Sequence, residues 1–150
     1  IAPFEAFKTK DSYIIIAAGN DKLFTKLCDV LKIPETANDE RFNSNSLRCE
    51  NMDHLKEIFE KQLSSKSTDE WVKEMEELKI PCGPIFNIKQ AVENPQIHER
   101  NMIVKSYHKI IGEFKSAGNP IKMSTYKDEN TRGDIPDLDE HREKIIKEFS

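Results

Sequence analysis

The sequence has 150 residues, enough for one ordinary domain with a hydrophobic core and too few for two large ones. Charged residues make up 33 % and the net charge is -4, with Lys and Arg spread along the whole length. No basic cluster stands out, so we expect no nucleic-acid partner. The longest apolar run, residues 13–18, is far shorter than the roughly 20 residues of a membrane-spanning helix, so we also expect no membrane association.

The three cysteines, Cys28, Cys49 and Cys82, lie far apart in the sequence. A disulfide framework or a zinc site would need closer pairs, so we expect reduced thiols and no bound metal. Reduced thiols are typical of a cytoplasmic protein, with a mitochondrial location as the alternative in a eukaryote. Because the chain begins at Ile1 and not at Met, we expect it to be part of a larger protein.

The first element in the chain is a predicted β-hairpin. Residues 4–8 and 13–17 are extended in character and flank a polar segment of turn-forming residues. The second strand is too apolar to be half exposed, so we expect it to be buried. Asn20 or Asp21 then caps a helix that Pro34 ends. The apolar face of this helix consists of Leu23, Phe24, Leu27, Cys28 and Leu31.

The middle of the chain is predicted to be helical. The polar segment 39–51 contains a short helix, and residues 52–63 carry a clear helical stripe of apolar side chains. Ser67 and Glu70 have the spacing of a capping box and begin the next helix. Its predicted core face consists of Trp71, Val72, Met75 and Leu78. The segment 81–84 breaks the chain, and a short helix capped by Asn87 follows.

The last third predicts a second hairpin, an arm and a helix. Residues 103–111 and 113–117 form the hairpin around Gly112. Residues 124–137 are polar and read as a linker, and a helix over 139–149 ends the chain. Hairpins and helices without a βαβ repeat indicate the α+β class.

One turn is a candidate for contact with a ligand. Gly19, Asn20 and Asp21 follow a buried strand and open a helix, where backbone N–H groups often meet anions or substrates. The turn lacks the several glycines of a phosphate-binding loop, so an ordinary strand-to-helix connection remains the alternative. Residue chemistry alone reveals no function.

An ordered pattern over about 120 residues carries more information than any single site. The segments that form it are Ile1-Ala2-Pro3-Phe4-Glu5-Ala6-Phe7, Thr9, Asp11, Tyr13-Ile14, Ala17-Ala18-Gly19-Asn20-Asp21, Leu27-Cys28, Leu31, Asp39-Glu40-Arg41-Phe42, Asn45, Arg48, Asn51, Thr68-Asp69-Glu70-Trp71, Ile80-Pro81-Cys82-Gly83-Pro84-Ile85, Pro95-Gln96, Arg100, Met102 and Gly118-Asn119-Pro120-Ile121-Lys122. In this pattern the sequence resembles the class III coenzyme A-transferases, which include formyl-CoA transferases, carnitine–CoA transferases and α-methylacyl-CoA racemases. The sequence departs from the family at Lys32, where a helix-ending glycine is frequent.

The resemblance implies a fold and an assembly. Such enzymes are interlocked homodimers, with a large Rossmann-like domain and a small domain in each chain. This sequence resembles the C-terminal portion: residues 1–123 would be the small α+β domain, 124–138 a linker arm, and 139–150 a helix that returns to the large domain.

The resemblance also implies a reaction. In the transferases an aspartate attacks the acyl-CoA thioester and carries CoA as an aspartyl-CoA intermediate, since a carboxylate is a suitable nucleophile for this exchange. That aspartate would lie outside this chain, so we expect no catalytic residue here and no activity of the chain alone. The substrates would be an acyl-CoA and a carboxylic acid, without a permanently bound cofactor. Gly19, Asn20 and Asp21 remain the candidates for contact with the substrate.

Two alternatives remain open. In a racemase-like enzyme acid–base groups move an α-proton, and Asp21 would then be the candidate catalytic residue. The second alternative is a non-catalytic binding or dimerisation module.

Overall fold

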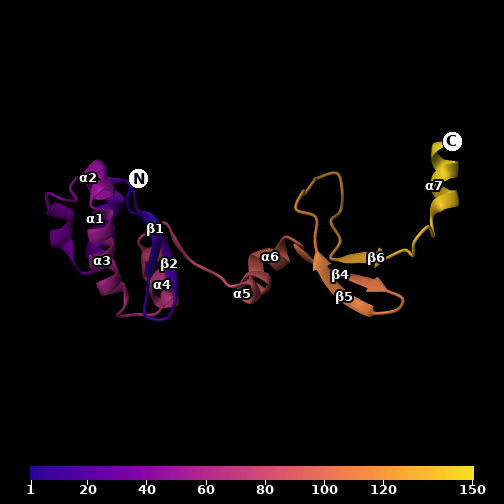
Figure 1. The fold of residues 1–150 in the computed structure, drawn as a ribbon, viewed down its shortest axis with the longest axis horizontal. Coiled ribbons are helices and arrows are strands. Elements are labelled where there is room, and N and C mark those ends of the chain that lie inside the picture. Colours follow the sequence, from indigo (N-terminus) through magenta and orange to yellow (C-terminus); the bar gives the residue numbers. More distant parts are fainter. The chain divides into compact units, whose positions relative to one another are not determined.

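The computed structural model describes all residues, 1–150, and the chain divides into two compact units (Figure 1). The first unit is Ile1–Ile85 and the second is Phe86–Ser150. The domain boundary expected at residue 123 therefore lies inside the second unit and does not coincide with this division.

A three-stranded antiparallel sheet, β1-β2-β3, organises the first unit. Strands β1 (Phe4–Lys8) and β2 (Tyr13–Ala17) form the predicted hairpin. The expectation that the second strand is buried is wrong, because its residues alternate: Ile14 and Ile16 face the core, whereas Tyr13 and Ile15 are exposed. Strand β3 (Cys82–Pro84) pairs with β2, although the sequence predicted only a chain break there. A proline is tolerated in β3 because this short strand lies at the edge of the sheet.

Two of the helices in the first unit begin at the capping residues that the sequence predicted. They are α1 (Asp21–Val30), the 3₁₀ helix η1 (Pro34–Asn38), α2 (Asn45–Glu50), α3 (Met52–Leu63) and α4 (Thr68–Glu77). The side chain of Asn20 accepts a hydrogen bond from the Leu23 N–H at 2.9 Å and so caps α1. Ser67 and Glu70 make both bonds of the capping box at the start of α4. Both predicted caps are confirmed.

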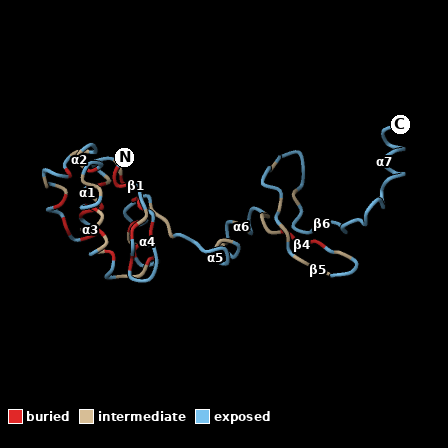
Figure 2. The backbone as a smooth tube through the Cα atoms, viewed as in Figure 1, coloured by how far each residue is buried: buried red, intermediate tan, exposed pale blue.

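One face of the sheet packs against the helices to form the core of the first unit, where the buried residues gather (Figure 2). Phe59 of α3 lies at its centre, with ring centroids 5.7 Å from Phe7 and 6.2 Å from Phe24. Trp71 and Met75 are buried as predicted, at 3 % and 0 % exposure. Leu78 is 43 % exposed, so its predicted place in the core is wrong. It lies beyond the last residue of α4, as the C-cap, and so is not part of the buried helical face.

The second unit contains a second small sheet and three short helices. Its elements are α5 (Ile88–Glu93), α6 (Pro95–Glu99), β4 (Ile103–His108), β5 (Gly112–Ala117), β6 (Thr131–Asp134) and α7 (Arg142–Phe149). The predicted hairpin is confirmed, but β4 ends at His108 and not at residue 111. Gly112 has a φ of 78°, which glycine adopts without strain. Strand β6 runs parallel to β4 and lies within the segment that the sequence predicted to be a linker.

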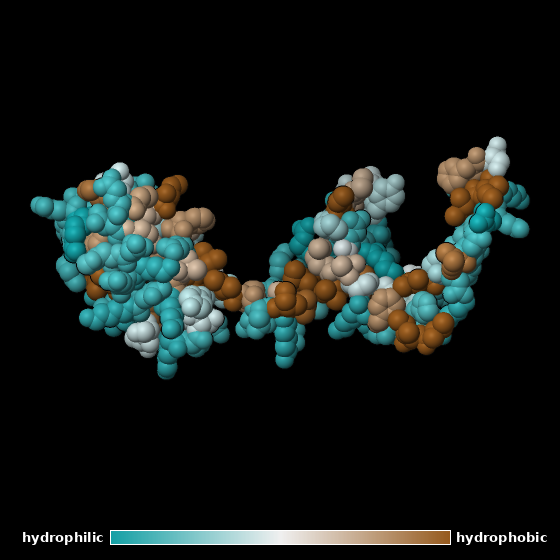
Figure 3. Space-filling model, in the orientation of Figure 1, coloured by the Kyte–Doolittle hydropathy of each residue, from teal (hydrophilic) through white to brown (hydrophobic).

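The second unit buries very little apolar surface. Val104 and Ser106 are its buried residues, whereas the first unit holds the rest of the buried core. Figure 3 shows hydrophobic atoms at the surface over α7 and at the turn between β4 and β5. The exposed residues there include Ile110, Ile111, Leu138 and Phe149. No helix of the chain is both long enough and apolar enough to cross a lipid bilayer.

Candidate functional site

The turn from Gly19 to Asp21 joins β2 to α1 and is held by close local contacts. The extended backbone of Asn20, with φ −92° and ψ 155°, places its side chain over the first turn of the helix. A Cβ atom on Gly19 would lie 1.9 Å from Cγ2 of Ile1, so a larger residue would not fit without displacing Ile1. The three predicted residues thus lie together at the start of α1.

Arg48 of α2 is the residue that ties this turn to the rest of the unit. It is fully buried, at 0 % exposure, and its guanidinium carbon lies 4.5 Å from the centroid of the Phe24 ring. Its four hydrogen bonds go to the Ala2 carbonyl at 2.9 Å, the Phe42 carbonyl at 3.0 Å, the Gly19 carbonyl at 3.3 Å and Oδ1 of Asp21 at 2.8 Å.

The ion pair between Arg48 and Asp21 joins a buried cation to an exposed anion. The Arg48 side chain is 1 % exposed and the Asp21 side chain is 76 % exposed. A buried guanidinium needs a partner charge and hydrogen-bond acceptors to offset its desolvation. Asp21 supplies that charge, so its carboxylate is engaged in the structure and is not a free group in the turn.

Helix α2 also holds the N-terminal segment beside the turn. Asn45 accepts a hydrogen bond from the Ala2 N–H at 3.0 Å, while Arg48 donates to the Ala2 carbonyl. The Ala18 N–H donates to the Pro3 carbonyl at 2.9 Å. Two side chains of one short helix therefore bind both polar groups of the same residue and align the N-terminal segment with the turn.

An apolar pocket of about 320 Å³ includes Ala17, close to the turn in sequence. It is lined by Ile15, Ala17, Pro81, Cys82, Gly83 and Pro84. Burial raises the pKa of the Cys82 thiol, and the thiol donates to the Val72 carbonyl at 3.9 Å. Both features favour a neutral thiol, which is a poor nucleophile, so the pocket offers apolar contact and no nucleophile.

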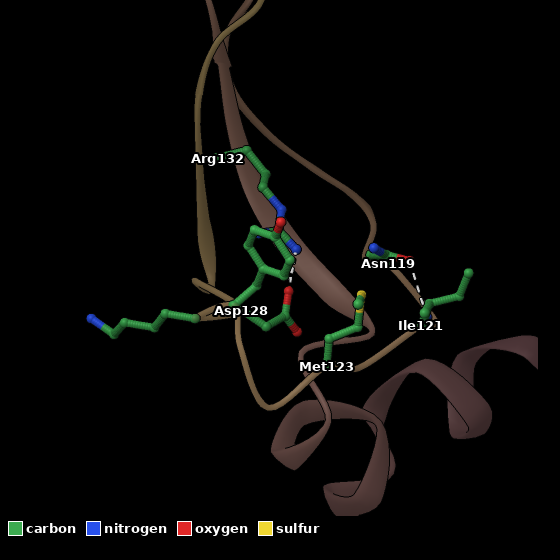
Figure 4. A pocket seen from close by; sticks show the side chains of 7 residues that line it. Asn119, Ile121, Met123, Asp128 and Arg132 are labelled. Atoms are coloured by element: carbon green, nitrogen blue, oxygen red, sulfur yellow. Dashed lines mark hydrogen bonds and ion pairs between the residues drawn. The ribbon is translucent and has the colours of Figure 1, made fainter.

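A second pocket, of about 430 Å³, lies in the second unit and is drawn in Figure 4. Arg132 and Asp128 point toward one another there and form an ion pair of 2.7 Å. Lys122 also contacts Asp128, and the two cations lower the pKa of this carboxyl. Because these charges are paired with each other, we assign no ligand to the pocket. No three His, Cys, Asp or Glu side chains of the chain come together as metal ligands would.

The sequence predicted the turn between β2 and α1 but not the contact of Arg48 with this turn. Arg48 contributed only one position to the pattern of resemblance, and its partners at residues 2, 19, 21 and 42 are distant in sequence. An arginine in a short helix carries no local signal of burial, since arginine is usually exposed.

Comparison with curated proteins relates the chain to CoA-transferases. It is 39 % identical over 150 residues to an acetyl-CoA:oxalate CoA-transferase of Acetobacter aceti, covering 100 % of this chain and 37 % of that protein. It is 32 % identical over 148 residues to a succinyl-CoA:glutarate CoA-transferase of Homo sapiens, covering 99 % of this chain and 34 % of that protein. The chain thus spans about a third of the length of these relatives.

Solved structures give the same result. The crystal structure of Rv3272 from Mycobacterium tuberculosis matches with a TM-score of 0.80 and 25 % identity, over 95 % of this chain and 40 % of that one. A CAIB/BAIF family protein from Brucella suis matches with a TM-score of 0.77 and 32 % identity, over 100 % of this chain and 38 % of that one. The α+β class expected from the sequence is confirmed.

The model of one protein family covers nearly the whole chain. It is described as CoA-transferase family III, and it matches residues 1–142. The chain therefore belongs to CoA-transferase family III.

Proposed function

We propose that this chain is the small-domain portion of an acyl-CoA:carboxylate CoA-transferase. The observation that carries the proposal is the family match over residues 1–142. The names of the relatives add the substrate class, because each pairs a short acyl-CoA with a dicarboxylate: acetyl-CoA with oxalate in one and succinyl-CoA with glutarate in another. We assign this class, a short acyl-CoA donor and a small dicarboxylic acceptor, to the enzyme that contains the chain.

The proposed reaction uses an aspartate as a covalent carrier of CoA. Its carboxylate attacks the thioester carbonyl and expels the CoA thiolate, which leaves a mixed anhydride. The thiolate then attacks the aspartyl carbonyl of the anhydride, which releases the donor acid and forms aspartyl-CoA. The acceptor carboxylate then attacks the carbonyl of aspartyl-CoA and expels the CoA thiolate, which leaves a second mixed anhydride. The thiolate attacks the acceptor carbonyl of this anhydride, so the acceptor leaves as the new thioester and the aspartate is restored.

The nucleophile in this proposal lies outside residues 1–150. Two carboxylates of the first unit illustrate this, because both have structural roles. Asp21 is paired with Arg48 at 2.8 Å. Asp11 accepts a bond from the Thr68 N–H at 2.9 Å, and this bond lowers the pKa of its carboxyl. These roles support a chain that completes a substrate site without supplying the attacking group.

The role proposed for the first unit is contact with the substrate through Gly19, Asn20 and Asp21. The apolar pocket that includes Ala17 supports this role, since apolar clefts with few polar groups are typical of ligand sites. The same engagement of Asp21 by Arg48 argues against a free acid–base group in the turn, so we propose transferase and not racemase chemistry.

We also propose that the enzyme acts as a homodimer. The second unit exposes large apolar side chains such as Leu138 and Phe149, and such surfaces are typical of protein interfaces. The cytoplasmic location expected from the free thiols Cys28, Cys49 and Cys82 remains a prediction.

The proposal is tested by assaying CoA transfer with two proteins: residues 1–150, and the gene product that contains them at the length of the relatives. Acetyl-CoA, formyl-CoA and succinyl-CoA are each incubated with oxalate or glutarate, and the CoA esters are separated by chromatography. We expect transfer by the longer protein and none by residues 1–150 alone. Epimerisation of a 2-methylacyl-CoA without any transfer, or transfer by the 150-residue chain itself, would contradict the proposal.

A further inference from the structure

The contacts of Arg48 point to a role beyond stabilising the fold. Burial of a charged group costs desolvation that its ion pair does not always offset, so an apolar side chain of similar volume is often as stabilising. Stability alone therefore does not account for a buried guanidinium at this position. The planar guanidinium donates several hydrogen bonds in fixed directions, so it holds several acceptors at defined angles. An apolar side chain or an ammonium group does not do this.

The acceptors that this fork fixes belong to separate segments that converge on the turn. Nη2 holds both the Gly19 carbonyl and the Asp21 carboxylate, which are the two ends of the turn. Nε and Nη1 hold the carbonyls of Ala2 and Phe42. Arg48 thus ties the turn to the interior of the unit, whereas the Asn20 cap sets its local shape.

We propose that Arg48 is a positioning residue for substrate binding: by holding Gly19 and Asp21 it fixes the 19–21 turn in the place where the turn meets the substrate. The substrate half of this role rests on the proposed function. Arg48 touches no substrate itself, since its side chain is 1 % exposed.

The chain offers a test variant and a matched control. Asp21→Asn removes the partner charge of Arg48 without replacing any buried side chain, while Asp21→Glu keeps the charge. Asp39 and Arg41 form another Asp–Arg pair, at 2.6 Å, in which both side chains are partly exposed. Asp39→Asn therefore removes the charge of the same kind of pair without changing a residue of the turn. Arg48→Lys keeps the buried charge but loses the fork.

The first measurement is amide hydrogen exchange in the 150-residue chain. Hydrogen bonds to charged groups contribute enough that losing one should speed local opening by roughly tenfold or more. In Asp21→Asn and Arg48→Lys we expect this increase at the amides of Ala18, Leu23 and Phe24. The amides of Ile14 and Ile16 in β2 should exchange at the same rate as in the parent chain. Asp21→Glu and Asp39→Asn should match the parent at all five amides. Unchanged exchange at the turn in Asp21→Asn would overturn the proposal, whether or not Arg48→Lys folds.

The second measurement is the kinetics of the longer enzyme, at a temperature where circular dichroism shows every variant to be folded. We expect KM for the acyl-CoA to rise about tenfold in Arg48→Lys and in Asp21→Asn with kcat within about twofold, since a displaced contact weakens ground state and transition state alike. Because Asp21 is itself proposed to contact the substrate, the rise in Arg48→Lys is the result that tests the positioning role. Asp21→Glu should restore most of the affinity. If the parent enzyme transfers CoA but Arg48→Lys has an unchanged KM, the positioning role is refuted and the proposed function is not. A parent without transfer activity would refute the proposed function and this role with it.

Discussion

Replacement of Trp71 by alanine should remove a large share of the stability of the first unit. Trp71 is 3 % exposed, and its Nε1–H donates to the Leu63 carbonyl at 2.8 Å. Lys66 Nζ lies 4.4 Å from the ring centroid. Truncation of a buried Trp to Ala costs about 3–5 kcal/mol, and the two polar contacts place this site toward the upper end. A unit of this size has a total stability of about 4–13 kcal/mol, so the loss is a large share of it.

The assay for Trp71→Ala is urea unfolding of the 150-residue chain, followed by circular dichroism because the chain has a single Trp. Trp71→Phe keeps most of the buried area and loses the hydrogen bond to Leu63, so it should cost about 1–2 kcal/mol. Leu78→Ala is the matched control, since Leu78 is 43 % exposed and should cost less than about 1 kcal/mol. A loss below about 1 kcal/mol in Trp71→Ala, or an equal loss in Leu78→Ala, would refute the assignment of the core.

Three further predictions concern stability. Lys32 follows α1 with a φ of 60°, so Lys32→Gly should relieve strain and raise the free energy of unfolding in urea by about 0.5–1 kcal/mol; a decrease would contradict this. The pKa of Asp11 is lowered mainly by the Thr68 N–H. The contribution of the Asp11 carboxylate to the free energy of unfolding is therefore fully present above the unfolded pKa of about 4, and it is lost as the pH falls through the lower pKa of the folded state. The difference in Tm between the parent and Asp11→Asn should therefore be constant from pH 7 to about 5 and shrink at lower pH; a difference that grows on acidification would contradict it. Deletion of residues 86–150 should leave the Trp fluorescence transition of the first unit within a few degrees, because the core lies in residues 1–85; an unfolded product would show that the unit is not autonomous.

Local signals in the sequence were sufficient to predict several caps and the hairpin of the first unit. The caps at Asn20 and Ser67 were predicted because a capping side chain bonds to a backbone group only three residues away. The β1–β2 hairpin was predicted because its strands are joined by a short polar turn. These features depend on neighbours in sequence, and the structure confirms them.

Features that depend on distant partners were missed. Strand β3 pairs with β2, more than 60 residues earlier, and β6 pairs with β4 across a long loop. Both strands are short and contain Pro or Gly, so their own residues give almost no β signal. The burial of Arg48 likewise depends on acceptors from several segments, which come together only in the folded unit.

The most direct test of the central claim is the position of the CoA adduct in the longer enzyme. The enzyme is incubated with acyl-CoA in the absence of an acceptor acid, digested, and its peptides are mapped by mass spectrometry. The account predicts a CoA thioester on a carboxylate outside residues 1–150, and loss of that adduct when the acceptor is added. A CoA adduct on a carboxylate within residues 1–150, such as Asp21 or Asp11, would contradict it.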